Sequence, residues 1–253
     1  MNLDLVPALE AVSDELRIWR RHGAAPQLWW RDDDAHVESP QLVRLCELLA
    51  GETLVLAVIP GLLTDGLVRM LEGRPQVSVA QHGWKHINHA PPDVWPCEFP
   101  GGRDRAEIER ELREGREVLR RAFGPRFLPM LAPPWNTLAG WVFRKSREFG
   151  YSALSLGRMR HPFSGRGYAR EVNAEIDIGD WNREGEFVGA ERLGAALLAA
   201  LRARREAEDW HEPLGVNSHH LRMASEDFDV LGEFVRLFRD AGVVWASPQS
   251  LVS

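Results

Sequence analysis

Three consecutive aspartates, Asp32, Asp33 and Asp34, directly follow a short apolar segment at residues 27–31. Adjacent carboxylates repel one another and would weaken the fold unless water, a cation or nearby arginines neutralise them. A bound divalent cation would do so. The alternative is a solvated turn in which Asp34 caps the following helix. The trio is therefore a candidate for metal binding or for acid–base chemistry.

Two histidines four residues apart, His82 and His86, form the second candidate group. This spacing lets two imidazoles meet one cation, either on a helix or around a tight loop that closes a strand. The chain has nine histidines, so such a pair also arises by chance, but its place after an apolar run favours function. His89 is expected to support the pair or to cap a helix rather than to bind the cation.

A third candidate is His219, which follows the apolar segment 214–218. Histidine can give or take a proton near neutral pH. Strand alternation would then turn His220 to the opposite side. Asp177 and Asp180 close another apolar segment, and either carboxylate could orient an imidazole. The alternatives are a core or surface histidine pair and surface aspartates.

These side chains need a scaffold that brings segments far apart in the chain together. Short apolar runs predict strands at residues 27–31, 53–59, 77–81, 127–131, 151–156, 173–178, 214–218 and 243–246. Amphipathic stretches predict helices at 7–21, 39–50, 62–71, 103–123, 139–149, 189–208 and 227–241. Seven or eight β/α steps favour an α/β barrel or a closely related curved sheet, with a doubly wound open sheet as the alternative.

We expect one domain over residues 1–253, with residues 1–26 forming a helix before the first strand, and a mobile loop at 158–170. In parallel β/α folds, functional groups lie on the loops after the strands, at one rim. The candidate groups all follow predicted strands, and so does Pro133-Pro134-Trp135. Trp135 is the best candidate to contact a ligand, because a flat apolar face can line a sugar-sized cleft.

The composition excludes several partners. The chain has 253 residues, 44% of them hydrophobic, which is enough for a full core. A net charge of −6 argues against a broad phosphate-binding surface, so nucleic acid is not an expected partner. No apolar run is long enough for a membrane span, and the N-terminal segment lacks the pattern of a signal peptide. We expect a cytoplasmic location and no membrane partner; nothing in the sequence indicates an oligomeric state.

Taken in order, these segments resemble the polysaccharide deacetylase superfamily (NodB homology, carbohydrate esterase family 4) from about residue 27 to the C-terminus. That family has an Asp-Asp pair, His-x-x-x-His, a Pro-Pro-aromatic segment, an Asp-Trp pair and a late histidine. The matching residues are Asp33-Asp34, His82 and His86, Pro133-Pro134-Trp135, Asp180-Trp181 and His219. The resemblance implies a single-domain, distorted (β/α)7-8 barrel of the NodB type.

The resemblance also implies a role for each residue. Asp33 would be the general base, and a divalent metal, most commonly Zn²⁺, would be held by Asp34, His82 and His86. The remaining roles would go to His219 as the acid, Asp180 as its orienting group, and Trp135 and Arg31 as substrate or oxyanion contacts. The implied reaction is metal-assisted hydrolysis of an N-acetyl or similar acyl group on a carbohydrate-like small molecule or oligosaccharide.

Two features of the sequence leave alternatives open. The triple aspartate also permits Asp32 and Asp33 as the pair; we prefer the later pair because related sequences with an Arg-x-Asp-Asp pattern would put Arg31 in register with it. The family usually pairs its base with an arginine before the Pro-Pro segment, where this chain has Leu131-Ala132. The positive charge would then come from another loop, and the candidates are Arg31, Lys85 and Arg103.

Two other functions fit the same sequence. One is a carbohydrate-binding or regulatory protein that keeps the scaffold and has lost turnover, as the absent arginine permits. The other is a metal-independent glycoside hydrolase, which needs two carboxylates about 5–10 Å apart across a cleft. Hydrolysis of N-acetylated sugars and acyl esters with and without a chelator would separate these functions. The absence of a secretion signal favours a small or soluble substrate inside the cell.

Overall fold

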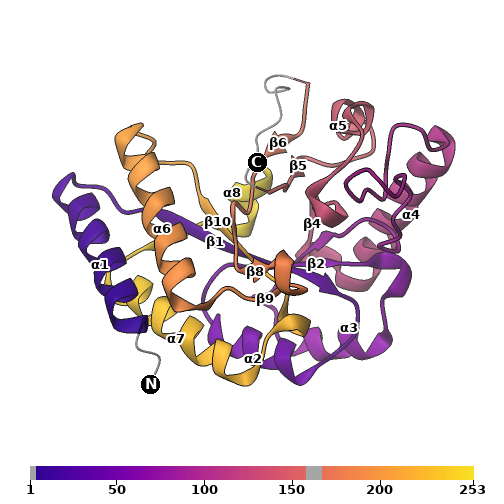
Figure 1. Ribbon diagram of the computed structural model, residues 1–253. Helices are drawn as coiled ribbons and strands as arrows, with labels where there is room; N and C mark the ends of the chain where they lie inside the picture. Colours follow the sequence, from indigo (N-terminus) through magenta and orange to yellow (C-terminus); the bar gives the residue numbers. More distant parts are fainter. Residues whose placement is uncertain (1–3, 158–166) are drawn as a thin grey trace.

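A curled parallel sheet forms the centre of the protein (Figure 1). The computed structural model describes residues 4–157 and 167–253. Within these residues the strand order is β6-β5-β4-β3-β2-β1-β10-β7, with β11 paired to β1, and every pairing in this sheet is parallel. The strands are β1 (Gln27–Ala35), β2 (Leu54–Val58), β3 (Ser78–Gln81), β4 (Phe127–Leu131), β5 (Ala153–Leu154), β6 (Arg170–Glu171), β7 (Ile176–Asp177), β10 (Leu214–Ser218) and β11 (Val244–Trp245).

Helices cover the outer side of this sheet, and α1, α6, α7, α2, α3 and α4 follow one another around it in Figure 1. The α-helices are α1 (Leu5–Arg21), α2 (Pro40–Leu48), α3 (Asp65–Glu72), α4 (Arg105–Phe123), α5 (Gly140–Lys145), α6 (Gly189–Glu206), α7 (Ser225–Asp240) and α8 (Pro248–Val252). Short 3₁₀ turns span Pro60–Leu62, Gly124–Arg126, Pro134–Asn136, Trp181–Arg183 and His220–Arg222. A separate antiparallel pair joins β8 (Gly179–Asp180) to β9 (Glu186–Phe187). None of the described helices is both long and apolar enough to cross a membrane.

Side-chain caps begin several of the helices that follow strands. Ser39 accepts a hydrogen bond from the Leu42 amide at 3.0 Å, and Pro40 occupies the first turn of α2. Thr64 and Asp104 cap α3 and α4 in the same way. These side chains satisfy amide groups that have no partner within the helix. The helix after β1 therefore begins at Pro40, directly after the predicted cap Ser39.

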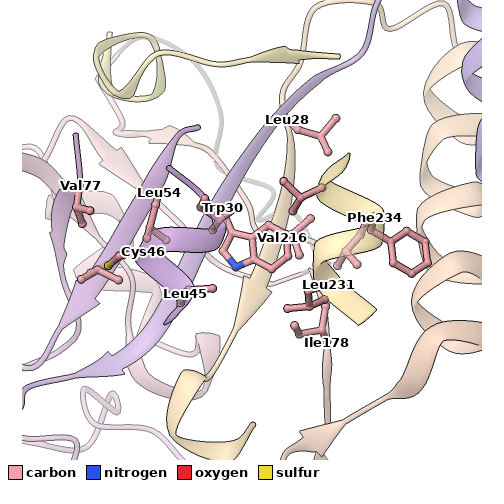
Figure 2. Close-up of a cluster of buried hydrophobic side chains, with 14 of the residues drawn as sticks. Leu28, Trp30, Leu45, Cys46, Leu54, Val77, Ile178, Val216, Leu231 and Phe234 are labelled. Atoms are coloured by element: carbon pink, nitrogen blue, oxygen red, sulfur yellow. The ribbon is translucent and has the colours of Figure 1, made fainter. Parts of the chain in front are cut away.

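Alternation along β1 divides the core into two layers. Leu28 and Trp30 point outward and pack under the helices with Leu231 and Phe234 of α7 (Figure 2). Trp29, between them, points inward to a smaller cluster that includes Leu251 of α8. Because side chains on a strand alternate, Arg31 and Asp33 continue the inward series, whereas Asp32 continues the outward one. Asp32 and Asp33, although adjacent in sequence, therefore lie on opposite faces of the sheet.

Strand β10 repeats this alternation beside β1. Leu214 and Val216 belong to the outer core, and the parallel register pairs Arg31 with Asn217 and Asp32 with Ser218. Gly215 faces inward, where a Cβ would lie 2.4 Å from the Asn173 carbonyl oxygen. Only glycine fits there without a shift of the backbone. Beyond Gly215, the inner face carries Arg31 and Asn217, so it becomes polar toward the carboxyl ends of β1 and β10.

The α/β architecture and the curled parallel sheet agree with the prediction, but several boundaries differ. β1 continues to Ala35, so the three aspartates belong to the strand instead of following it, because Asp32 still pairs with β10 and β2 and Ala35 pairs with Val58 of β2. The helix predicted at 62–71 is divided between Pro60–Leu62 and α3. The strand predicted at 173–178 is reduced to β7, and most of the loop predicted at 158–170 lies outside the described residues. The single-domain assignment stays a prediction.

Candidate functional site

The end of β1 presents the three aspartates in three different directions. The register with β2 shifts between Asp32 and Ala35, and Asp34 has φ of 66°, in the left-handed region that a non-glycine residue rarely adopts. Asp33 points into the sheet's interior and is 3% exposed, whereas Asp34 reaches the rim and is partly exposed. The irregularity at the strand end thus turns Asp34 toward the loop after β3.

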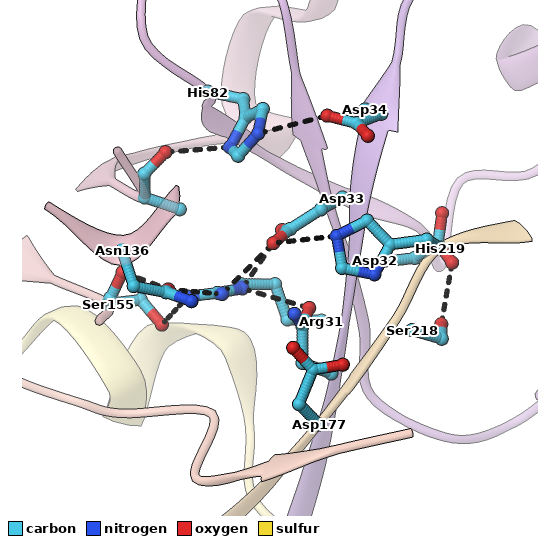
Figure 3. Close-up of polar contacts among 12 residues, drawn as sticks. Arg31, Asp32, Asp33, Asp34, His82, Asn136, Ser155, Asp177, Ser218 and His219 are labelled. Atoms are coloured by element: carbon cyan, nitrogen blue, oxygen red, sulfur yellow. Dashed lines mark hydrogen bonds and ion pairs between the residues drawn. The ribbon is translucent and has the colours of Figure 1, made fainter. Parts of the chain in front are cut away.

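Asp34 meets the two predicted histidines at this rim. Its Oδ1 lies 3.2 Å from Nε2 of His82, a contact drawn in Figure 3, and 3.2 Å from Nε2 of His86. The ligand atoms of these three residues all lie within 4.8 Å of one another, and they form the one such group among the described residues. His82 follows β3, and His86 follows it around a tight loop with φ of 58°. The three residues predicted as ligands therefore converge, in a loop rather than on a helix.

The donor set suits a divalent cation. The Nδ1–H of His82 donates to the Ala132 carbonyl at 2.8 Å, which leaves Nε2 directed at Asp34 with its lone pair available. The Oδ1 atom of Asp34 is buried and has no partner of hydrogen-bond geometry. Burial opposes ionisation of Asp34, but its interaction with the neighbouring imidazoles of His82 and His86 outweighs burial and holds the pKa of this carboxyl far below its ordinary value. One carboxylate and two imidazoles match the ligands of a catalytic zinc site with open positions.

Arg31 supplies the positive charge for Asp33. Its Nη2 donates to Asp33 Oδ2 at 3.0 Å, and its Nε lies 2.9 Å from Oδ1. Burial would raise the pKa of Asp33, but the guanidinium, followed by His82 and His219, outweighs burial and lowers it. Asp33 is therefore an ionised carboxylate in a buried position. Arg103, another candidate for this charge, is occupied elsewhere, since it binds Glu111 at 2.6 and 2.7 Å.

Arg31 is fully buried, which corrects its prediction as a substrate or oxyanion contact. Its Nη1 donates to the carbonyl and the hydroxyl of Ser155, both at 2.8 Å, and its Nη2 donates to Asn136 Oδ1 at 2.8 Å. Its Nε also donates to Asn217 Oδ1 at 3.2 Å. The guanidinium therefore joins β1 to the segments after β4 and β5 and to β10. No role was predicted for Ser155, Asn136 or Asn217, although alternation along β10 places Asn217 on the inner face.

His219 lies on the other side of Asp33, with its Nε2 3.8 Å from Asp33 Oδ2. Its Nδ1 is buried without a hydrogen-bond partner among the described residues. The indole of Trp181 packs edge-on against its imidazole, with ring centroids 4.6 Å apart. Trp181 Nε1 in turn donates to Asp177 Oδ2 at 2.9 Å. His219 is thus oriented by an aromatic contact that Asp177 holds in place.

Asp180 does not orient His219 as predicted. Its carboxylate binds the Arg192 guanidinium and accepts a hydrogen bond from the Asn182 amide at 3.1 Å. Hydrogen bonding to Arg192 holds the pKa of Asp180 below its ordinary value. The side chain therefore joins the β8 turn to α6. The sequence pattern identified the right segment, but the partner on a distant helix was not visible in it.

Trp135 lies at the rim beside the histidine pair. Its ring centroid is 4.4 Å from that of His86, and its carbonyl accepts a hydrogen bond from Trp95 Nε1 at 3.4 Å. Trp135 and Asn136 have φ of 56° and 55°. Left-handed conformations at non-glycine residues tend to gather at functional sites, and this group adjoins Asp34 and His86. The segment after β4 is therefore shaped to hold both Trp135 and the amide that binds Arg31.

Asp32 is bound on the opposite face of the sheet and is excluded from the histidine pair. His220 Nδ1 and the His220 amide both bind its carboxylate, the amide at 3.0 Å, and Ser218 Oγ donates to it at 2.6 Å. Both Asp32 and His220 are fully buried. The geometry therefore favours Asp33 and Asp34 over Asp32 and Asp33 as the pair that faces the rim.

Comparisons with known proteins identify the fold. No family model matches the chain, and no curated protein does. Among solved structures, a putative polysaccharide deacetylase from Mycobacterium smegmatis superposes with a TM-score of 0.60 and 17% identity over 90% of this chain and 91% of that one. A Streptococcus mutans CE4 esterase superposes with a TM-score of 0.57 and 14% identity, over 92% of this chain and 90% of that one. A family 4 carbohydrate esterase from Streptomyces lividans, in complex with acetate, superposes with a TM-score of 0.54 and 13% identity, over 90% of this chain and 96% of that one. The resemblance predicted from the sequence is confirmed at the level of the fold.

Proposed function

On the premise that this chain has the fold of the polysaccharide deacetylases, we propose that it is a metal-dependent hydrolase. It would remove an N-acetyl or similar acyl group from a carbohydrate-like small molecule or oligosaccharide. The observation that carries the proposal is the convergence of Asp34 Oδ1 with the Nε2 atoms of His82 and His86, 3.2 Å from each. The structural neighbours are described as carbohydrate esterases and deacetylases, which supports the same reaction class.

Asp34, His82 and His86 would hold a divalent cation, and their donor set fits zinc. When bound, such a cation polarises a carbonyl group and lowers the pKa of water. Three protein ligands leave positions open for water and substrate. The carboxylate of Asp34 and the imidazoles of His82 and His86 would hold the cation at the rim of the curled sheet, on the side where Asp33 lies.

Asp33 would act as the general base. The Arg31 guanidinium keeps this buried carboxylate ionised, so it can accept a proton from the attacking water. Arg31 itself is held by Ser155 and Asn136, which restricts the rotation of the pair. A base held in one orientation needs little reorganisation when the proton moves.

His219 would act as the general acid. Its Nε2 lies 3.8 Å from Asp33 Oδ2, so the two groups can serve opposite ends of one scissile bond. In hydrolysis, the carbonyl carbon gains the water oxygen, its bond to nitrogen breaks, and the departing nitrogen takes a proton from His219. A backbone N–H at Trp135 would donate to the developing oxyanion, an interaction worth about 3 kcal/mol per well-placed donor.

The test is hydrolysis of a panel of N-acetylated sugars and acyl esters, with and without a chelator, by protein whose metal content is measured. We expect release of the acyl group, its loss with chelator and its return when zinc is added. A protein that binds zinc but turns over no member of the panel would instead be the catalytically silent binding protein. Glycosidic cleavage that resists chelation would indicate a metal-independent glycoside hydrolase. The cytoplasmic location stays a prediction that cell fractionation would test.

A further inference from the structure

A buried carboxylate outside the predicted motifs lies directly beneath the loop that carries His86. Glu98, in the segment between β3 and α4, is 1% exposed. Carboxylates are rarely buried to this degree unless charged or hydrogen-bonding partners compensate. The partners of Glu98 therefore indicate what it does.

Those partners are backbone amides of the histidine loop. Glu98 Oε1 accepts from the Lys85 amide at 2.7 Å and from the Ile87 amide at 3.4 Å, and Oε2 accepts from the Trp84 amide at 3.0 Å. Hydrogen bonds from several amides to an ionised carboxylate are shorter and stronger than neutral ones. The carboxylate thus accepts the amide hydrogen bonds that a regular helix or strand would otherwise satisfy in this loop.

The loop is shaped to receive this carboxylate. Gly83 has φ of 61°, and a Cβ at that position would lie 1.8 Å from Glu98 Oε2. No side chain fits there without displacing the carboxylate. Asn88 Oδ1 accepts from the Cys97 amide at 3.0 Å and holds the segment that carries Glu98 against the same loop. Two independent features, the glycine and the amide bonds, therefore point to one function for Glu98.

His86 depends on this arrangement more than His82 does. The imidazole of His82 is fixed by the Ala132 carbonyl, and its backbone continues from β3. His86 has a left-handed backbone with φ of 58° and lies between Lys85 and Ile87, the two residues whose amides bind Glu98 Oε1. Since this conformation is unfavourable without support, the bonds on either side maintain it.

We infer that Glu98 is a positioning residue that holds His86 against Asp34 and so sets the affinity of the site for its metal ion. The inference rests on the proposed function. Groups that orient a metal ligand affect affinity by about 10–100-fold when they are removed. Glu98 acts at one remove, through the loop backbone, and does not contact the reacting atoms.

The experiment measures the Zn²⁺ dissociation constant of the metal-stripped, full-length protein by competition with a chromophoric chelator. Glu98→Gln keeps the size of the side chain but removes its charge and turns an NH₂ group toward an amide donor. We expect Zn²⁺ to bind about 10–100-fold more weakly to this variant. Glu98→Asp, which retains the charge but is one methylene too short to reach the amides, is expected to weaken binding as well and decides the matter if Glu98→Gln does not fold.

A matched control is Glu15→Gln. Glu15 is also 1% exposed, but it lies between α1 and α6, where it binds Arg205 and Arg202. We expect this variant to lose thermal stability and to bind Zn²⁺ like the wild type. A general effect of losing a buried carboxylate would instead weaken binding in both variants and would overturn the inference.

A double-mutant cycle tests whether Glu98 acts through His86. In a His86→Ala background, Glu98→Gln should add little further loss of affinity, because the ligand that it positions is gone. Full additivity, or wild-type affinity in the Glu98 variants, would refute the role of Glu98 while leaving the metal site itself intact. Failure of the wild-type protein to bind Zn²⁺ would instead overturn the proposed function, together with the inference that rests on it.

Discussion

Replacing Arg31 with methionine isolates the contribution of its buried guanidinium. Methionine keeps much of the length and apolar bulk but none of the hydrogen bonds to Asp33, Ser155, Asn136 and Asn217. The side chains of Arg31 and Asp33 are 0% and 4% exposed, so water cannot replace the lost partner. Removing one member of a buried ion pair costs about 3–5 kcal/mol. For a chain of 253 residues this corresponds to a decrease in melting temperature of roughly 6–20 °C.

The stability difference between wild type and Arg31→Met should also depend on pH, which tests the pairing of Arg31 with Asp33 directly. In the wild type the pKa of Asp33 is lowered, so ionised Asp33 stabilises the fold above its unfolded pKa, and this stability is lost as the pH falls through the folded pKa. Without Arg31, burial dominates and the pKa of Asp33 rises. We therefore expect the stability difference between wild type and Arg31→Met to be largest at neutral pH and to shrink toward about pH 4.

The raised pKa of Asp33 in Arg31→Met should also change how activity depends on pH. A base with a raised pKa is protonated over more of the acidic range, so the acidic limb of the kcat/KM profile should move to higher pH in Arg31→Met. Urea unfolding at both pH values and the pH–rate profile are the two assays. Arg204→Met is the control, because Arg204 is also largely buried, in ion pairs with Glu175 and Asp209. Its loss should reduce stability and leave the acidic limb in place. An unchanged acidic limb in folded Arg31→Met would refute the pairing of Arg31 with the base.

Four further substitutions separate metal binding, catalysis and packing. Asp33→Asn should retain zinc by elemental analysis but lower kcat by about 10²–10⁴-fold, whereas His82→Ala should lose both; full activity in either variant would contradict the assigned roles. Asp32→Ala should destabilise the protein by about 3–5 kcal/mol in denaturant unfolding, because it leaves His220 buried without its partner; a loss below about 1 kcal/mol would argue against this buried pair. Gly215→Ala places a methyl group 2.4 Å from a backbone oxygen and should cost about 1–3 kcal/mol, measured in the same way; unchanged stability would show that β10 can move aside.

The sequence by itself determined the order of strands and helices and which residues stand at the strand ends. Apolar runs separated by amphipathic stretches predicted the parallel sheet, because the periods of strands and helices depend only on local geometry. The same reasoning brought Asp34, His82 and His86 to one rim. Topology alone places the carboxyl ends of parallel strands together, whatever lies between them in the chain.

Only the tertiary structure decided which partner each polar group takes. Two-residue alternation indicates which face a side chain occupies, but three adjacent aspartates and a register shift after Asp32 leave the frame ambiguous until β10 is in place. The binding of Arg31 to Asn136, of Asp180 to Arg192 and of Glu98 to loop amides joins groups whose sequence separation carries no periodic signal. A buried charge binds whichever opposite charge or donor the folded chain brings within about 3 Å. That choice depends on long-range packing, which no local pattern in the sequence encodes.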